Sequence, residues 1–333
     1  MPEIWEGLAG DEVGTGDEVV ADEVVADGGV PDDRVLVLNP VSGDGDHRER
    51  VRKLADEAGF TVLETHSAGE AVTFGRLAGE AGADVVAAAG GDGTINEVVR
   101  GLDAADAFED VTFGVVPTGT GNNFAGNLGT EDIRHAFEVL MRGERRRIDV
   151  ATAGDDELFV NSCIAGLTAE ASASTSPEMK DRLGMLAYVV SGLRAVREFD
   201  ALPLSVEAEC PTDADEKSWS GEAVMVLVGN ARRFPAEGRS QANCEDGLLE
   251  ATIIERMPST NLLEEAALHR LFGDETEHVT RLLASELHID VRRDEPVGFS
   301  FDGETGEYDA LAMGTRQQVL EVCVGDDYEP NPE

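Results

Sequence analysis

Three segments rich in glycine and small polar residues each follow an apolar run, and they are the parts of the sequence that could do chemistry. They are residues 39–43 (NPVSG), 90–97 (GGDGTINE) and 117–124 (PTGTGNNF). Glycine lets a backbone approach phosphate oxygens closely and adopt positive φ, and free amides at a helix N-terminus attract anions. The three segments therefore predict a site that binds phosphate groups, with Thr94 and Thr120 as hydroxyl donors.

The three segments match neither of two common nucleotide-binding motifs. The sequence contains no GxxxxGK[ST] motif, and Asn96 stands where a dinucleotide fingerprint starting at Gly91 needs its third glycine. A P-loop and a Rossmann dinucleotide site are therefore disfavoured. One such segment alone is equally compatible with an ordinary strand-to-helix turn, but three on consecutive strands favour a binding site. Asp92 would repel phosphate unless it binds a metal ion or accepts a substrate proton.

Alternating strands and helices must bring the three segments together. Apolar runs predict strands at residues 35–38, 60–64, 84–89 and 111–116. One helix is expected to end at about residue 59, and three more are expected at 69–82, 95–102 and 133–142. This rhythm predicts right-handed crossovers and a mostly parallel sheet, which carries the three segments at the carboxyl ends of its strands.

After residue 147 the pattern changes to short alternating runs that predict antiparallel strands. These runs are residues 148–152, 158–161, 204–209, 223–229 and 248–254. Two helices are expected at 179–199 and 261–272, and the last strand, 319–324, could return to either part of the chain. The expected fold class is an α/β N-terminal domain with a parallel sheet, followed by a β-rich, antiparallel, sandwich-like C-terminal domain.

The predicted domain organisation has three parts. Residues 1–33 contain no Lys or Arg and include a tandem DEVVA repeat, so we expect a solvated acidic extension, with a docked amphipathic helix as the alternative. The α/β domain is expected at residues 34–147, and the β-rich domain at 148–325.

The charge of the chain limits its partners. The 333 residues include 68 Asp and Glu against 26 Lys and Arg, a formal net charge of −42. So negative a surface repels nucleic acid at ordinary salt, and we expect no nucleic-acid partner. Because a Debye length of about 3 Å at 1 M salt screens such charge, the composition favours a protein of a salt-loving cell. The apolar strands argue against the alternative, an acidic disordered protein.

The sequence favours a soluble, cytoplasmic protein. The N-terminus has no basic region before an apolar run, and the longest charge-free apolar stretch, residues 183–193, is shorter than the roughly 20 residues of a membrane span. Four widely spaced cysteines fit reduced and mostly buried thiols, and six unclustered histidines are expected at the surface or in packing.

The three segments, in this order and spacing, resemble those of the diacylglycerol kinase catalytic domain superfamily, which includes bacterial soluble lipid kinases and sphingosine kinases. GGDGTINE followed by VVRGL at 98–102 is the strongest sign, and the resemblance covers residues 34–325. It implies an NAD-kinase-like fold with ATP bound in the cleft between two domains. The implied ATP contacts are Asn39, Pro40, Val41, Ser42, Gly43, Thr65, Gly90, Gly91, Asp92, Gly93, Thr94, Ile95, Asn96 and Thr120.

The resemblance also implies a magnesium site and catalytic acids. The run at residues 243–248 (NCEDGL) matches a structural site of bacterial members, with the Asp246 carboxylate and the carbonyls of Asn243 and Leu248 as ligands. A plain Asp-Gly turn is the alternative there.

The DGE motif at residues 302–304 matches the catalytic acids of the family. Glu304, or else Asp302, would be the general base, and Asp92 resembles the acid with that role in the sphingosine branch. The sequence does not decide among them. Many members carry Asp where this chain has Asn123, which would weaken a metal site there.

The expected function is that of an ATP- and Mg²⁺-dependent lipid kinase. It would phosphorylate a hydroxyl of a diacylglycerol-like, ether-lipid or prenol acceptor, in peripheral contact with the inner membrane surface, and the family often forms homodimers. An NAD kinase, which shares a GGDGT loop, is one alternative. The other is a non-catalytic nucleotide-binding regulator, although both Asp92 and Glu304 are present.

Two further features of the sequence each allow two interpretations. The basic residues Arg142, Arg145, Arg146 and Arg147 favour contacts at a helix C-terminus over contacts with phosphate. The apolar face of the helix at 179–199 favours core packing over a lid on a lipid tail.

Overall fold

The computed structural model describes residues 33–43, 45–155, 157–166, 201–210, 217–231, 242–256 and 279–330. The expected acidic extension, apart from its last residue, lies outside the described residues, as do the helices expected at 179–199 and 261–272. Among the described residues, no helix is long and apolar enough to cross a membrane.

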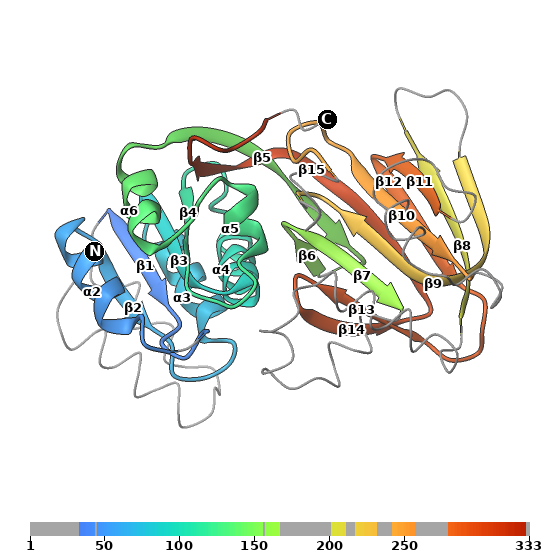
Figure 1. The fold of residues 1–333 in the computed structure, drawn as a ribbon, viewed down its shortest axis with the longest axis horizontal. Helices are drawn as coiled ribbons and strands as arrows, with labels where there is room; N and C mark the ends of the chain where they lie inside the picture. The colour runs from blue at the N-terminus through green and yellow to red at the C-terminus, as the bar shows by residue number, and fades with distance from the viewer. Residues whose placement is uncertain are drawn as a thin grey trace, which may run out of the picture.

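The N-terminal part is an α/β layer structure with the predicted parallel strands (Figure 1). The strands are β1 (Arg34–Leu38), β2 (Thr61–Glu64), β3 (Val85–Gly90) and β4 (Thr112–Pro117), in the order β4-β3-β1-β2. The helices are α2 (Arg48–Glu57), α3 (Glu70–Glu80), α4 (Asp92–Ala104), α5 (Asn123–Asn127) and α6 (Ile133–Arg142). The parallel sheet expected from the sequence is therefore confirmed.

Helices cover both faces of this sheet because its strands are apolar on both sides. Along β1, Val35 and Val37 pack in one buried cluster with side chains of α3 and α4. Leu36 and Leu38, which point to the other face, pack in a second cluster with side chains of α2 and α6. Burial on both faces is what a continuous apolar strand predicts.

The C-terminal part is an antiparallel β structure, as expected. Its strands are β5 (Glu144–Ala153), β6 (Glu157–Phe159), β7 (Ser162–Gly166), β8 (Leu202–Glu209), β9 (Lys217–Gly229), β10 (Leu249–Glu255), β11 (Val279–Ala284), β12 (Glu286–Val291), β13 (Val297–Phe301), β14 (Glu304–Tyr308) and β15 (Ala310–Val324).

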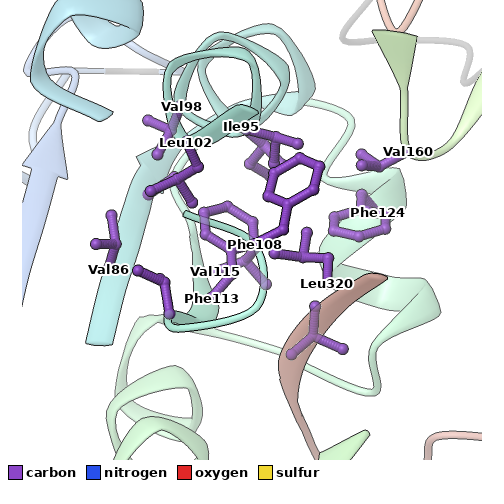
Figure 2. Close-up of a cluster of buried hydrophobic side chains, with 14 of the residues drawn as sticks. Val86, Ile95, Val98, Leu102, Phe108, Phe113, Val115, Phe124, Val160 and Leu320 are labelled. Atoms are coloured by element: carbon purple, nitrogen blue, oxygen red, sulfur yellow. The ribbon is translucent and has the colours of Figure 1, made fainter. Parts of the chain in front are cut away.

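The last strand, β15, returns to the parallel sheet. Its first half pairs with β12, and after a bulge between Arg316 and Leu320 its second half pairs in parallel with β4. Figure 2 shows Leu320 of β15 in the same buried cluster as Phe113 of β4, Phe124 of α5 and Val160, which lies between β6 and β7. The two parts of the chain thus share one core, and the boundary predicted near residue 148 falls inside β5.

The basic cluster lies mostly on a strand, not at the end of a helix. Helix α6 ends at Arg142, and the three following arginines belong to β5. Arg145 still donates to the carbonyl of Leu140 near the end of α6, at 3.1 Å. Arg146 instead forms an ion pair with Glu245, at 2.5 Å, so the expectation for the cluster was wrong for this residue.

Candidate active site

The segment at residues 39–43 leaves β1 and bonds directly to the second glycine loop. The Asn39 side chain closes its own turn by accepting from the Val41 amide at 3.1 Å, and its Nδ2 donates to Thr94 Oγ1 at 3.1 Å. Ser42 Oγ donates back to the Asn39 carbonyl at 3.0 Å. The first loop is therefore fixed against the N-terminus of α4.

The first loop also contacts the third. Ser42 Oγ and Thr118 Oγ1 are 2.8 Å apart. Gly43 has φ of +53°, and a Cβ there would lie 2.5 Å from the Thr118 carbonyl oxygen. Only glycine permits this approach, because other residues rarely adopt positive φ and no side chain fits the space.

Asp92 joins the second loop to the third. Its Oδ1 accepts from the Phe124 amide at 2.9 Å, and its Oδ2 accepts from the Asn123 amide at 3.2 Å. Close packing accompanies these bonds, since a Cβ on Gly119 would lie 2.4 Å from Gly91 Cα. The three loops therefore converge at the carboxyl ends of β1, β3 and β4, as the sequence predicts.

The DGE turn between β13 and β14 reaches this convergence from the other end of the chain. Asn96, on α4, donates from Nδ2 to Asp302 Oδ2 at 3.2 Å. Asp302 has φ of +49° and also accepts from the amides of Val160 at 2.7 Å and Ser162 at 2.8 Å. Burial raises the pKa of Asp302 to about 6, although the N–H donors favour its anion.

Carboxylates of both parts of the chain share this region. Glu304, at the start of β14, is exposed. Burial and the charge of Glu304 raise the pKa of Glu97, on α4, while the Gly69 amide donates to its carboxylate. The charge of Asp92 likewise contributes to the raised pKa of Asp302. The structure therefore brings together acids that are some 200 residues apart in sequence.

Comparisons with known proteins agree with this arrangement. The family model for the diacylglycerol kinase catalytic domain matches residues 33–153, and that for the YegS C-terminal NAD kinase beta sandwich-like domain matches residues 161–324. A protein of Yersinia pseudotuberculosis serotype I (strain IP32953), named "Probable lipid kinase YegS-like", is 30% identical over 282 residues, which cover 82% of this chain and 91% of the relative.

The chain belongs to the diacylglycerol kinase catalytic domain family. A Yersinia pestis (strain Pestoides F) protein with the same name as the first relative is 30% identical over 276 residues, covering 81% of this chain and 89% of its own. A solved structure from Bacillus anthracis str. Sterne has the same fold, with a TM-score of 0.72, 24% identity, and coverage of 89% and 97% of the two chains. Family membership makes the chain a phosphotransferase that acts on an alcohol group.

In this diacylglycerol kinase family member, some of the residues expected to contact ATP have exposed side chains and others are buried. Val41 is 81% exposed, and Thr120 is exposed. Ile95 is fully buried in the core, and Asn96 is 1% exposed, with Nδ2 donating to Asp302 and to the Leu158 carbonyl. Thr65 is buried, and its amide and hydroxyl both donate to the carbonyl of Leu38, at 2.9 and 3.4 Å.

Three residues of the site were not singled out from the sequence. Thr118 and Glu97 stand inside the motifs, so their position next to the selected residues was the available signal. His47 was expected to be a surface or packing residue; it is buried, and its Nε2 lies 3.0 Å from the Asn39 carbonyl oxygen and 3.3 Å from Ser42 Oγ. His47 therefore helps to hold the first loop in place.

The predicted cation turn is tightly held in this diacylglycerol kinase fold. Asp246 Oδ1 accepts from the Leu248 amide at 2.9 Å, and burial raises the Asp246 pKa. Asp149 accepts from the Gly247 amide at 2.6 Å, and its pKa is raised to about 6, mainly by burial and further by the charge of Asp246. Among the described residues, no group of three His, Cys, Asp or Glu side chains could hold a metal ion. Any cation here would depend on carbonyl oxygens.

Proposed function

We propose that the chain is a lipid kinase that transfers the γ-phosphoryl group of ATP, with Mg²⁺, to a hydroxyl of a lipid acceptor. The observation that carries the proposal is the bond from Asn96 to Asp302, which holds the DGE turn against the glycine loops. A kinase needs the nucleotide phosphates and a carboxylate near the acceptor hydroxyl in one place. The names of the Yersinia relatives support a lipid as the acceptor.

Glu304 is the general base in this proposal, and Asp302 positions it. Asp302 is only 8% exposed, and both of its oxygens accept hydrogen bonds from backbone amides. It has little access to a substrate hydroxyl. Glu304 follows two residues later and is exposed, so its carboxylate is accessible to an acceptor hydroxyl. General base help of this kind contributes roughly 10²–10⁴ in rate.

In this proposal, the glycine loops bind the nucleotide and Asp92 holds two of them together. Backbone amides of the segments at 39–43 and 90–94 would bind phosphate oxygens, with the N-terminus of α4 adding positive partial charge. Asp92 lies at that N-terminus and holds the third loop through Phe124. When bound, Mg²⁺ would neutralise charge on the β- and γ-phosphate oxygens.

The turn at 243–248 fits a structural Mg²⁺ by the chemistry of its donors. Asp246 supplies a carboxylate, and the carbonyls of Asn243 and Leu248 would complete an all-oxygen set, which hard cations prefer. Beside the turn, burial and the charge of Asp246 raise the pKa values of Asp149 and Glu250. A bound cation would relieve this repulsion among the three carboxylates.

The acceptor follows from the family rather than from a described contact. A diacylglycerol-like, ether-lipid or prenol hydroxyl is proposed, reached by peripheral contact with the membrane surface. Molar salt would permit that contact, since it screens the charge of −42 from anionic headgroups.

Transfer of label from γ-³²P ATP tests the proposal. The full chain is incubated with Mg²⁺ in molar KCl and a total lipid extract, and separately with NAD. We expect label in the organic phase, and a loss of about 10²–10⁴-fold in the Glu304→Gln variant. Glu307→Gln, which changes another exposed acid of β14, is the matched control and should keep full activity. Label only in NADP, or full activity of Glu304→Gln, would contradict the proposal.

A further inference from the structure

Two buried aspartates each hold a different segment of the β-rich part. Asp302 accepts from the amides of Val160 and Ser162 and so fixes the connection between β6 and β7. Asp149, on β5, is 0% exposed and accepts from the amides of Gly247 at 2.6 Å and Gln318 at 2.7 Å. The first aspartate belongs to the DGE motif, and the second holds the proposed cation turn.

Asn230 lies between these two segments and directly follows β9. It is 0% exposed, and its Nδ2 donates to the carbonyl of Asp149 and to the carbonyl of Val160, both at 2.9 Å. Its backbone amide donates to the Asn161 carbonyl at 3.0 Å. One side-chain amide therefore joins the backbone that Asp149 anchors to the backbone that Asp302 anchors.

The two polar atoms of the Asn230 side chain differ in their hydrogen bonding: Nδ2 donates two bonds to buried carbonyls. Its Oδ1 is buried and has no hydrogen-bond partner among the described residues. A buried acceptor without a partner costs free energy, but an apolar residue at this position would leave the carbonyls of Asp149 and Val160 without these two donors. The two donated bonds hold the Asp149 segment and the Val160 segment in a fixed relative position, which is what a positioning residue does.

We propose that Asn230 is a positioning residue that couples the turn at 243–248 to the loop at 160–162, so that a divalent cation bound at the turn orders the loop that Asp302 and the DGE motif depend on. The inference rests on the cation site and the kinase activity proposed above. The coupling would pass through hydrogen bonds of this chain, which run from the turn through Asp149 and Asn230 to Val160 and Asp302.

The path consists of hydrogen bonds of 2.6–2.9 Å, which are buried except for the part-buried bond from Gly247 to Asp149. The turn is tied to Asp149 twice, through the Gly247 amide and through the bond from the Asp149 amide to the Cys244 carbonyl at 2.6 Å. Asn230 carries the connection to Val160, and the Val160 amide donates to Asp302 at 2.7 Å. Low dielectric strengthens such bonds, and hydrogen bonds in a chain polarise and strengthen one another.

Hydrogen exchange in the full chain tests the coupling without reference to catalysis. Amide exchange is compared with and without MgCl₂ in molar KCl, for the wild type and for Asn230→Ala and the milder Asn230→Ser. In the wild type, we expect Mg²⁺ to slow exchange both at 244–248 and at 160–162, by about fivefold or more at the distant loop. In the variants, protection should persist at the turn and be lost at 160–162.

A matched control and a kinetic readout accompany this measurement. Thr130→Val removes another buried polar atom that has no partner among the described residues, and it should behave like the wild type. Steady-state kinetics of Asn230→Ser should show a lower kcat at an unchanged KM for ATP, because the loops that bind ATP are untouched. A thermal melt of each variant confirms that it is folded.

The outcomes separate this inference from the proposed function. Protection at 160–162 that survives in both folded Asn230 variants overturns the coupling, even if the wild type phosphorylates lipid. No protection at 244–248 in the wild type overturns the cation site and the inference with it. Protection lost as expected, in a protein that phosphorylates no lipid, supports the coupling and contradicts the proposed function.

Discussion

Asn96 and Asp302 are 206 residues apart in the chain, and their side chains meet in a hydrogen bond of 3.2 Å between Nδ2 and Oδ2. Asn96 belongs to the helix that follows the glycine loop, and Asp302 begins the DGE turn. The bond therefore fixes the proposed base, Glu304, relative to the proposed phosphate site. Its loss should affect the chemical step more than the binding of ATP.

Replacing Asn96 by Ala should lower both stability and kcat. The change removes a hydrogen bond to a buried carboxylate, which is worth about 1.5–3 kcal/mol. We expect a corresponding loss in the free energy of unfolding, measured by urea denaturation in molar KCl, and a fall in kcat with little change in the KM for ATP. A variant with lower stability but wild-type kcat would show that the bond serves folding alone.

Stability should fall as the pH rises from about 4 to about 7. Burial raises the pKa of Asp149 and Asp302 from 3.8 to about 6 in the folded protein. The folded state therefore holds these protons more tightly, so their stabilisation is complete below the unfolded pKa and is lost as the pH passes the folded pKa. The pKa values of Glu70 and Asp132 are lowered in the folded protein, so their contribution to stability is lost only as the pH falls below their unfolded pKa values.

Urea denaturation at several pH values, in molar KCl without divalent cations, measures this dependence. Molar salt suppresses the contribution of the many surface carboxylates. A free energy of unfolding that rises between pH 5 and pH 7 would contradict the expected sign.

Alanine at the two crowded loop glycines should damage catalysis. Gly43 has positive φ and a Cβ position 2.5 Å from the Thr118 oxygen, and a Cβ at Gly119 would lie 2.4 Å from Gly91 Cα. Each change pushes two loops apart, and a displacement of about 1 Å costs on the order of 10²-fold in kcat/KM. Gly126→Ala is the control, since nothing lies within 4 Å of its added Cβ. Equal kcat/KM in all three variants would exclude a shared phosphate site.

Asn123→Asp should make stability depend more strongly on Mg²⁺. The Asn123 side-chain amide lies 3.3 Å from Asp92 Oδ2, so an aspartate would place two carboxylates together. We expect a lower melting temperature without Mg²⁺ and a larger rise on adding it than in the wild type. Ala81→Asp adds the same charge at the exposed end of α3 and serves as the control. Identical Mg²⁺ responses of the two variants would count against a cation at Asp92.

Salt should stabilise the whole protein. With 68 acidic against 26 basic residues, repulsion opposes compaction at low ionic strength. The melting temperature should therefore rise steeply between about 0.1 M and 2 M KCl, as the Debye length shrinks from roughly 10 Å to below 3 Å. Sucrose at equal osmolality is the control and should raise it less. A melting temperature independent of KCl would argue against adaptation to salt.

Local patterns in the sequence were sufficient to predict the class of fold and the convergence of the three glycine-rich segments at one edge of the sheet. The run from Val35 to Leu38 is apolar on both faces, which requires helices on both sides of a parallel strand. Each glycine segment follows such a strand, and the carboxyl ends of parallel strands meet at one edge. The spacing of apolar residues and the positions of glycine-rich turns are local properties, so a single sequence is enough to recognise them.

Only the tertiary structure decided which side chains of the motifs are free to act. Asn96 stands in the glycine motif with the other residues expected to contact ATP, yet its amide is buried against Asp302. Asp302 and Glu304 are equivalent acids in the sequence, but one is enclosed by amides and the other is exposed.

The same holds for contacts that link distant parts of the chain. Neither the return of β15 to β4 nor the bridge that Asn230 makes between Asp149 and Val160 leaves a pattern in the local spacing of residues. Hydrophobic period fixes which face of an element is buried, because that depends on neighbours three or four residues away. Which polar groups meet depends on pairs that can be 206 or more residues apart, and only the packed chain brings those pairs within hydrogen-bonding distance.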